Sequence, residues 1–174
     1  NGEIYNTNEL RKELEKQNVS FKTSHSDTEV VLIGLSIYGK DFIKKLRGQF
    51  SIAFYDSNIK KLMLIRDRVG QKPLFYHEDE EQVLFSSNLL SVATLIKSPQ
   101  ISEQGFSEYI NYGVVPSPNT IFKDIKKVSP GEVIEFNLSR KPIITKKNIY
   151  WQIENYIGNE KFDATEFFKL FDES

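Results

Sequence analysis

The most restrictive feature of this sequence is a short apolar run at 62–65, Leu-Met-Leu-Ile, between Lys61 and Arg66. A strand with one face in water alternates apolar and polar residues, but every residue of this run is apolar. A run of this length suits a strand that is covered from both sides. The sequence therefore predicts a sheet that has other layers on both of its faces.

Alternating apolar residues predict further strands around this run. The segment 50–55 places its two phenylalanines and one isoleucine on one face. Val19, Phe21 and Thr23 also follow the period of two that is typical of a strand. Strands are predicted at 19–23, 50–55, 62–65, 74–76, 82–85, 133–136 and 143–144.

Helical patterns lie before and after these strands. Ser26 and Glu29 form a capping box that opens a helix at Asp27, and Gly39 ends it. Helices are predicted at 7–17, 27–38, 41–46, 88–96 and 103–112. Antiparallel hairpins that are flanked by separate helices indicate a layered α+β domain rather than alternating βαβ units.

Composition excludes several classes of function. The 23 lysines and arginines nearly balance the 24 acidic residues, so no broad basic face for nucleic acid or an anionic membrane is expected. The longest apolar stretch, 30–38, falls short of the ~20 residues that cross a bilayer, which predicts a soluble protein. The first residue is Asn1 and the last residues follow a helical pattern, so we interpret the chain as a fragment cut at both ends.

The residue types that usually carry metal, phosphate or thiol chemistry are scarce. The chain has no cysteine, and His25 and His77 have no metal-ligand spacing, so we expect no metal site. The nine glycines form no phosphate-binding loop.

Three local motifs have both a structural and a functional interpretation. Asn1-Gly2 is a common turn signal, but its amide and N–H groups can also donate together to an oxyanion during amide hydrolysis. Asp27 can complement the start of a helix or pair with a substrate ammonium. The segment 66–68, Arg-Asp-Arg, can be a salt-bridged turn or an anion site.

Several segments combine glycine, charged and aromatic residues in a fixed order. They are N-G-E-I-Y-N at 1–6, S-D-T-E-V-V-L at 26–32, L-R-G-Q-F-S-I-A-F-Y-D at 46–56, R-D-R-V-G-Q-K-P-L-F-Y at 66–76, Y-G-V-V-P-S-P-N-T-I-F at 112–122, S-P-G at 129–131 and Y-W at 150–151. Over residues 1–151 this pattern resembles the glutaminase domain of glutamine-hydrolysing asparagine synthetases.

This resemblance implies a fold and a set of site residues. The fold would be the four-layer αββα sandwich of the N-terminal-nucleophile hydrolases, of the class II glutamine amidotransferase type. Asn1 and Gly2 would form the oxyanion hole, and Glu3 and Asp27 would hold the α-amino end of glutamine. The nucleophilic cysteine and the arginine for the α-carboxylate would lie upstream, so this chain alone would be inactive.

The resemblance also implies a division into domains. Residues 1–153 would form the glutaminase domain. Residues 154–174 would form a linker and the first helix of an ATP-dependent synthetase domain, with Phe167, Phe168 and Phe171 as an apolar stripe over 162–171. The fragment itself would need no cofactor, whereas the missing domain would use ATP and magnesium to amidate aspartate. The expected partners are glutamine and that domain, a homodimer stays open, and the expected compartment is the cytoplasm.

Two alternatives remain open from the sequence. A related amidotransferase could act on a sugar acid or peptide of a polysaccharide or natural-product pathway, because the acceptor is chosen by residues outside this chain. In a β-lactam-synthetase-like protein, the same domain would be a non-catalytic scaffold.

Overall fold

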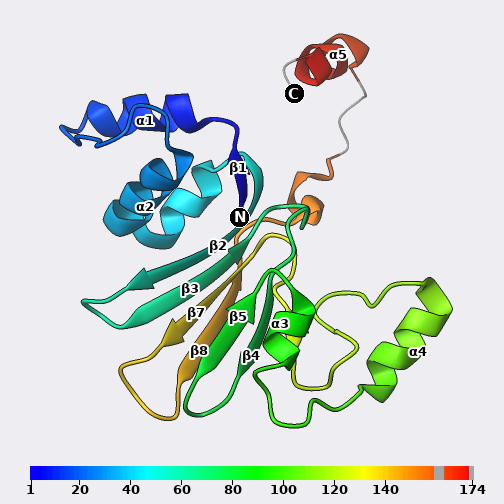
Figure 1. Ribbon diagram of the computed structural model, residues 1–174. Coiled ribbons are helices and arrows are strands. Elements are labelled where there is room, and N and C mark those ends of the chain that lie inside the picture. The colour runs from blue at the N-terminus through cyan, green and yellow to red at the C-terminus, as the bar shows by residue number, and fades with distance from the viewer. Residues whose placement is uncertain (159–162, 173–174) are drawn as a thin grey trace.

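The computed structural model describes residues 1–158 and 163–172 and contains two antiparallel sheets (Figure 1). The first sheet has the strand order β1 (Gly2–Ile4), β2 (Gly48–Asp56), β3 (Lys61–Arg66), β7 (Glu132–Asn137) and β8 (Ile144–Ile149). The second has the order β5 (Val83–Ser86), β4 (Phe75–Glu78) and β6 (Lys126–Lys127). The α-helices are α1 (Thr7–Glu15), α2 (Asp27–Tyr38), α3 (Leu89–Ala93), α4 (Glu103–Tyr112) and α5 (Ala164–Asp172), and the 3₁₀ helices are η1 (Gly39–Lys45) and η2 (Ile153–Tyr156).

Strand β3 is covered on both faces, as the apolar run at 62–65 predicts. Met63 and Ile65 belong to a core shared with α1, α2 and η1. Leu62 and Leu64 belong to a second core shared with β4 and β7. All four side chains are buried, so β3 lies between a helical layer and the second sheet.

A third core completes the sandwich on the far side of the second sheet. On β4, Tyr76 packs toward the first sheet, whereas its neighbour Phe75 packs against the core formed with α3. Figure 1 shows the resulting order of layers, with α1 and α2 on one face of the first sheet and α3 outside the second. The predicted α+β fold and its four-layer αββα arrangement are confirmed.

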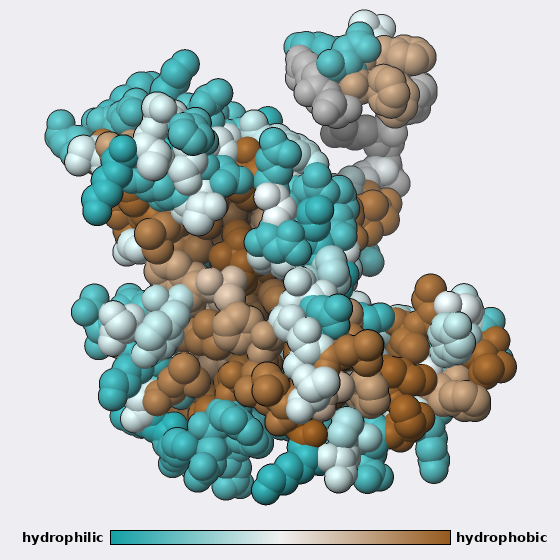
Figure 2. Space-filling model, viewed as in Figure 1, coloured by the Kyte–Doolittle hydropathy of each residue, from teal (hydrophilic) through white to brown (hydrophobic). Residues whose placement is uncertain are grey.

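The helix α4 contributes little to these cores. Gly105 is its buried residue, whereas Phe106, Tyr109 and Ile110 are exposed. Figure 2 shows brown atoms in the region of α4, at the edge of the molecule. Among the described helices, none is long and apolar enough to cross a membrane.

The strand predicted at 19–23 is wrong. Val19 and Phe21 pack against the first core, but the segment has no strand pairing. Arg11 holds it as a loop, because its guanidinium lies 4.2 Å from the Phe21 ring centroid and donates hydrogen bonds to the carbonyl oxygens of Thr23 and Ser26 at 2.7 and 3.2 Å. Contacts with a neighbouring helix therefore override the local alternation.

Other boundaries differ in detail. The predicted strand at 143–144 extends to Ile149, because β8 is an edge strand whose polar residues give no apolar alternation. The helix predicted at 41–46 is the 3₁₀ helix η1, and the one predicted at 88–96 is shortened to α3.

The last predicted helix is present as α5, although its first residue, Phe162, lies outside the described residues. Asp163 caps this helix by accepting hydrogen bonds from the N–H groups of Thr165 and Glu166 at 2.8 and 3.2 Å. The division at residue 153 stays a prediction.

Gly34 offers a direct test of the packing between α2 and η1. A Cβ atom at Gly34 would lie 2.1 Å from the Phe42 ring, and Phe42 is only 1% exposed. We expect Gly34→Ala to lower the free energy of unfolding by about 1–3 kcal/mol, because the ring must leave its packed position. Ser36→Ala, at an exposed position of the same helix, should change it by less than about 0.5 kcal/mol. Equal denaturant midpoints for the two variants would contradict this packing.

Candidate active site

The four residues predicted to bind glutamine line one pocket. Asn1, Gly2, Glu3 and Asp27 come together in a cavity of about 180 Å³ between β1, β2 and the start of α2. The other residues that line this pocket are Ile4, Thr28, Val31, Phe50, Ser51, Ile52 and Ala53. The fold thus joins segments that lie about 25 residues apart in the sequence.

Pairing of β1 with β2 directs the Gly2 N–H group. Asn1 and Ser51 exchange main-chain hydrogen bonds at 2.8 and 3.1 Å, so the adjacent pair Gly2 and Phe50 is a non-hydrogen-bonded pair. The Gly2 N–H therefore points away from β2. Ile4, two residues later, points its N–H in the same direction and donates to Asp27 Oδ2 at 3.3 Å.

The two strands approach so closely that only glycine fits at the contact. Gly2 has φ +124°, and a Cβ atom there would lie 1.9 Å from the carbonyl oxygen of Gln49. Gly48 makes the reciprocal approach, because its Cβ would lie 2.1 Å from the carbonyl oxygen of Glu3. This contact fixes the distance between Gly2 and β2. It therefore also fixes the position of the Gly2 N–H in the pocket.

Asp27 is held between the start of α2 and β1. Ser26 caps the helix by accepting a hydrogen bond from the Glu29 N–H at 3.2 Å, which places Asp27 at the first helical position. Asp27 Oδ2 accepts from the Ile4 N–H, and Oδ1 accepts from the Thr28 hydroxyl at 3.2 Å. The carboxylate is therefore both a helix-start group and a half-buried negative charge at the pocket wall.

The predicted capping box is only half formed. The Glu29 carboxylate does not return to Ser26 but accepts hydrogen bonds from the N–H groups of Lys22 and Thr23 at 2.6 and 2.9 Å. The Thr23 hydroxyl also donates to it, and these hydrogen bonds lower the pKa of Glu29. Glu29 thus ties the loop before the helix to the first turn that carries Asp27.

The charge of the pocket suits a cationic group. Glu3 and Asp27 are the charged residues among those described that line it, and both are acidic. A substrate ammonium can pair with them, and the Gly2 N–H and the Asn1 amide supply donors for a carbonyl oxygen at the same pocket. Carboxylates and N–H donors of this kind can bind the ammonium and the carbonyl oxygen of an amino-acid amide.

Several pocket residues were not singled out from the sequence. Thr28 and Val31 come from the first turns of α2, and Ser51 and Ala53 come from β2. The sequence signal for these residues is the pair of small side chains at 51 and 53, which leave space on the surface of the strand near Gly48. Their alternation with Phe50 and Ile52 had indicated only a two-faced strand.

The segment 66–68 joins the end of β3 to a turn, and its first arginine has a structural role. The Arg66 guanidinium donates hydrogen bonds to the carbonyl oxygens of Lys72, Val128 and Gly70 at 2.9, 2.8 and 2.7 Å. Burial lowers the pKa of Arg66. Hydrogen bonds from the Arg66 side chain to main-chain carbonyl oxygens organise the turn, and no ion pair among the described residues lies within the segment.

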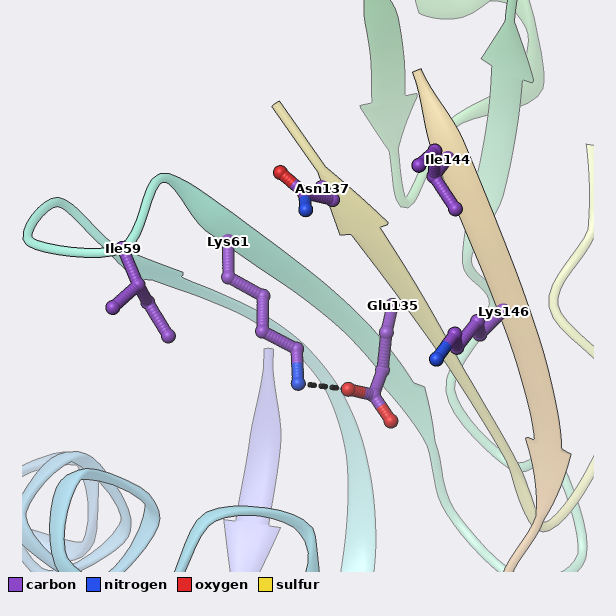
Figure 3. Close-up of a pocket in the computed structure, with 6 residues that line it drawn as sticks. All are labelled: Ile59, Lys61, Glu135, Asn137, Ile144 and Lys146. Carbon is purple, nitrogen blue, oxygen red and sulfur yellow. Dashed lines mark ion pairs between the residues drawn. The ribbon is translucent and has the colours of Figure 1, made fainter. Parts of the chain in front are cut away.

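A larger cavity of about 330 Å³ lies elsewhere on the first sheet (Figure 3). It is lined by Ile59, Lys61, Glu135, Asn137, Ile144 and Lys146. Lys61 and Glu135 form an ion pair there, so two of its charged side chains neutralise each other. None of the sequence-predicted site residues lines this cavity.

In the part of the chain that the structure describes, no cluster of three His or acidic side chains could hold a metal ion.

Several known proteins resemble this chain in sequence. Residues 1–151 match the family described as "Glutamine amidotransferase domain". Asparagine synthetase [glutamine-hydrolyzing] 1 of Bacillus subtilis is 37% identical over 150 residues, which are 86% of this chain and 23% of that protein. Asparagine synthetase [glutamine-hydrolyzing] 3 of the same organism is 34% identical over 168 residues, which are 95% of this chain and 26% of that protein. The chain therefore spans about a quarter of the length of these relatives.

Solved structures support the same fold. The glutamine phosphoribosylpyrophosphate amidotransferase of B. subtilis aligns with a TM-score of 0.55 at 22% identity and covers 87% of this chain and 28% of that one. A structure described as the allosteric regulatory enzyme of purine biosynthesis aligns with a TM-score of 0.56 at 21% identity, with the same coverage. From its sequence and its αββα sandwich, the chain belongs to the family of glutamine amidotransferase domains.

Proposed function

We propose that this chain acts within a longer protein as the glutaminase part of an asparagine synthetase. Glutamine would be hydrolysed in the pocket between β1, β2 and α2, and the ammonia would amidate aspartate in an ATP-dependent domain. The observation that carries the proposal is the meeting of Asn1, Gly2, Glu3 and Asp27 in one pocket, with the Gly2 N–H directed away from β2. The similarity to two asparagine synthetases supports the choice of aspartate.

Each of the four predicted pocket residues has a defined part in this proposal. Glu3 and Asp27 pair with the α-ammonium of glutamine and fix the direction of its side chain. The Gly2 N–H and the Asn1 amide donate to the oxygen that becomes negatively charged as the amide bond is attacked. The attacking thiolate is expected from a cysteine upstream of Asn1, and ATP and magnesium are expected to act in the synthetase domain.

The test uses the full-length protein that contains this chain. Glutamate release from glutamine and asparagine formation from aspartate and ATP are measured, with and without a thiol-directed glutamine analogue. Release of both products, with glutamate formation blocked by the analogue, supports the proposal. Glutamate without asparagine indicates an amidotransferase with another acceptor. Absence of glutamate release refutes the glutaminase function and favours a β-lactam-synthetase-like scaffold.

Asp27→Asn tests the ammonium-binding role. The substitution keeps the shape of the side chain and an oxygen for the Ile4 N–H, but it removes the charge. We expect the glutamine KM of the full-length protein to rise about tenfold, because charge-assisted pairing with the substrate is lost. The free energy of unfolding should change by less than about 1 kcal/mol. An unchanged KM would leave Asp27 as a helix-start residue only.

A further inference from the structure

We propose that Asp67 is a positioning residue for the oxyanion hole and acts on Gly2 through the peptide group between Gln49 and Phe50. This inference rests on the proposed function of the pocket. Asp67 does not line the pocket and lies on the other side of β2 from Gly2. It is fully buried, and no ion pair of the described residues includes it.

The Asp67 carboxylate is held by main-chain N–H groups. Oδ1 accepts from Gln71 at 2.9 Å, and Oδ2 accepts from Lys72 at 2.9 Å and from Phe50 at 3.3 Å. Two of these donors belong to the turn that follows Asp67, so they can be explained by the turn alone. The third donor belongs to β2, which makes Asp67 a direct link between the turn and the strand under the pocket.

Asp67 continues the sheet where β3 ends. The last pair in the register of β2 and β3 is Ser51 with Arg66. One residue further, the Asp67 N–H donates to the Phe50 carbonyl at 2.9 Å, and the Asp67 side chain accepts from the Phe50 N–H. Both main-chain polar groups of Phe50 are therefore bound by one residue.

The carbonyl oxygen of the same peptide group, on the edge opposite its N–H, lies against Gly2. A Cβ atom on Gly2 would lie 1.9 Å from the Gln49 oxygen and 2.7 Å from the Phe50 Cα. Gly2 thus rests on the peptide group whose N–H is bound by Asp67. A rotation of this group moves its oxygen toward or away from Gly2, because the peptide unit is planar and moves as one body. Asp67 accordingly sets the distance of Gly2 from β2 and with it the position of the Gly2 N–H.

This role differs from a purely structural one in the kinetic parameter that it changes. Oxyanion donors act on charge that develops in the transition state, so misplacing the Gly2 N–H lowers kcat and leaves glutamine binding by Glu3 and Asp27 intact. A structural role in the turn predicts lower stability, with the kcat of the folded protein unchanged.

The test compares Asp67→Ala and Asp67→Asn in the full-length protein. The alanine variant loses all three acceptor contacts, and we expect its kcat for glutamine hydrolysis to fall ~100-fold with a KM changed less than twofold. The asparagine variant keeps one oxygen but sets an amide NH2 group against one of the three N–H groups, so it holds the Phe50 peptide less firmly, and we expect a kcat about tenfold below that of wild type. If the alanine variant does not fold, the tenfold kcat loss of the asparagine variant carries the test.

Tyr150→Phe is the matched control. Its hydroxyl donates to the Arg66 carbonyl at 2.7 Å, so the variant loosens the same turn and leaves the bond between Asp67 and Phe50 in place. We expect this variant to lose stability but to keep its kcat. An Asp67→Asn kcat equal to that of wild type, or an equal loss in Tyr150→Phe and Asp67→Asn, would overturn the inference. A wild-type protein that releases no glutamate would instead refute the proposed function.

Discussion

Asn1→Ala in the full-length protein is expected to lower the kcat of glutamine-dependent synthesis by roughly 10²–10³-fold, which is the usual effect of removing one oxyanion donor. Asn1 lines the pocket beside Gly2, and its main chain is fixed by the paired hydrogen bonds with Ser51. Truncation of the side chain therefore removes the amide without releasing the strand. Synthesis from added ammonia should be unchanged, because it does not use the glutaminase pocket.

The isosteric variant Asn1→Asp separates donation from packing. It keeps the shape of the side chain but replaces the amide N–H donors with an acceptor that repels an oxyanion. Its kcat with glutamine should fall at least as far as that of Asn1→Ala. Equal losses of the glutamine-dependent and ammonia-dependent rates would show that Asn1 is structural.

Gly2→Ala is expected to impair both folding and glutamine hydrolysis. The residue has φ +124°, and the added Cβ would lie 1.9 Å from the Gln49 oxygen, so β1 must shift away from β2. Backbone strain and overpacking together should lower the free energy of unfolding by about 2–4 kcal/mol. In the protein that remains folded, displacement of the Gly2 N–H should reduce kcat with glutamine ~100-fold or more.

Gly113→Ala is the control for backbone strain. Gly113 has φ +72°, but a Cβ there would meet no atom within 4 Å, and the residue does not line the pocket. This variant should lose about 1 kcal/mol of stability and keep its kcat. Differential scanning calorimetry and steady-state kinetics compare the two variants. If Gly2→Ala matched Gly113→Ala in both measurements, the close approach of β1 to β2 would not be needed for activity.

Local chemistry made much of the fold predictable. The Ser26 cap and Gly39 define α2 because helix ends need partners for their free N–H and carbonyl groups, and these partners lie within a few residues. The strand at 62–65 was predicted as doubly covered because four consecutive apolar residues leave no face for water. The family motifs also named Asn1, Gly2, Glu3 and Asp27 as one site.

Local patterns failed where distant contacts decide. The alternation at 19–23 is outweighed by the contacts of Arg11 with Phe21 and with two carbonyl oxygens, which hold the segment as a loop. The edge strand β8 is defined by its pairing with β7, and the polar residues at 145–148 carry no signal for this pairing. The conformation of the loop at 19–23 and that of β8 both depend on which element of the fold lies beside them.

The sequence by itself determined the layered α+β fold and the ends of α2, because side-chain period and capping act over a few residues, and the resemblance of its motifs to a known family named the four pocket residues. Only the tertiary structure decided how these residues act together. The Ile4 N–H meets Asp27 23 residues away, and Phe50 meets Asp67 17 residues away. Strand register and core packing set such contacts. Asp67 therefore looks in the sequence like part of a turn, whereas in the fold its carboxylate supports the peptide group beneath Gly2.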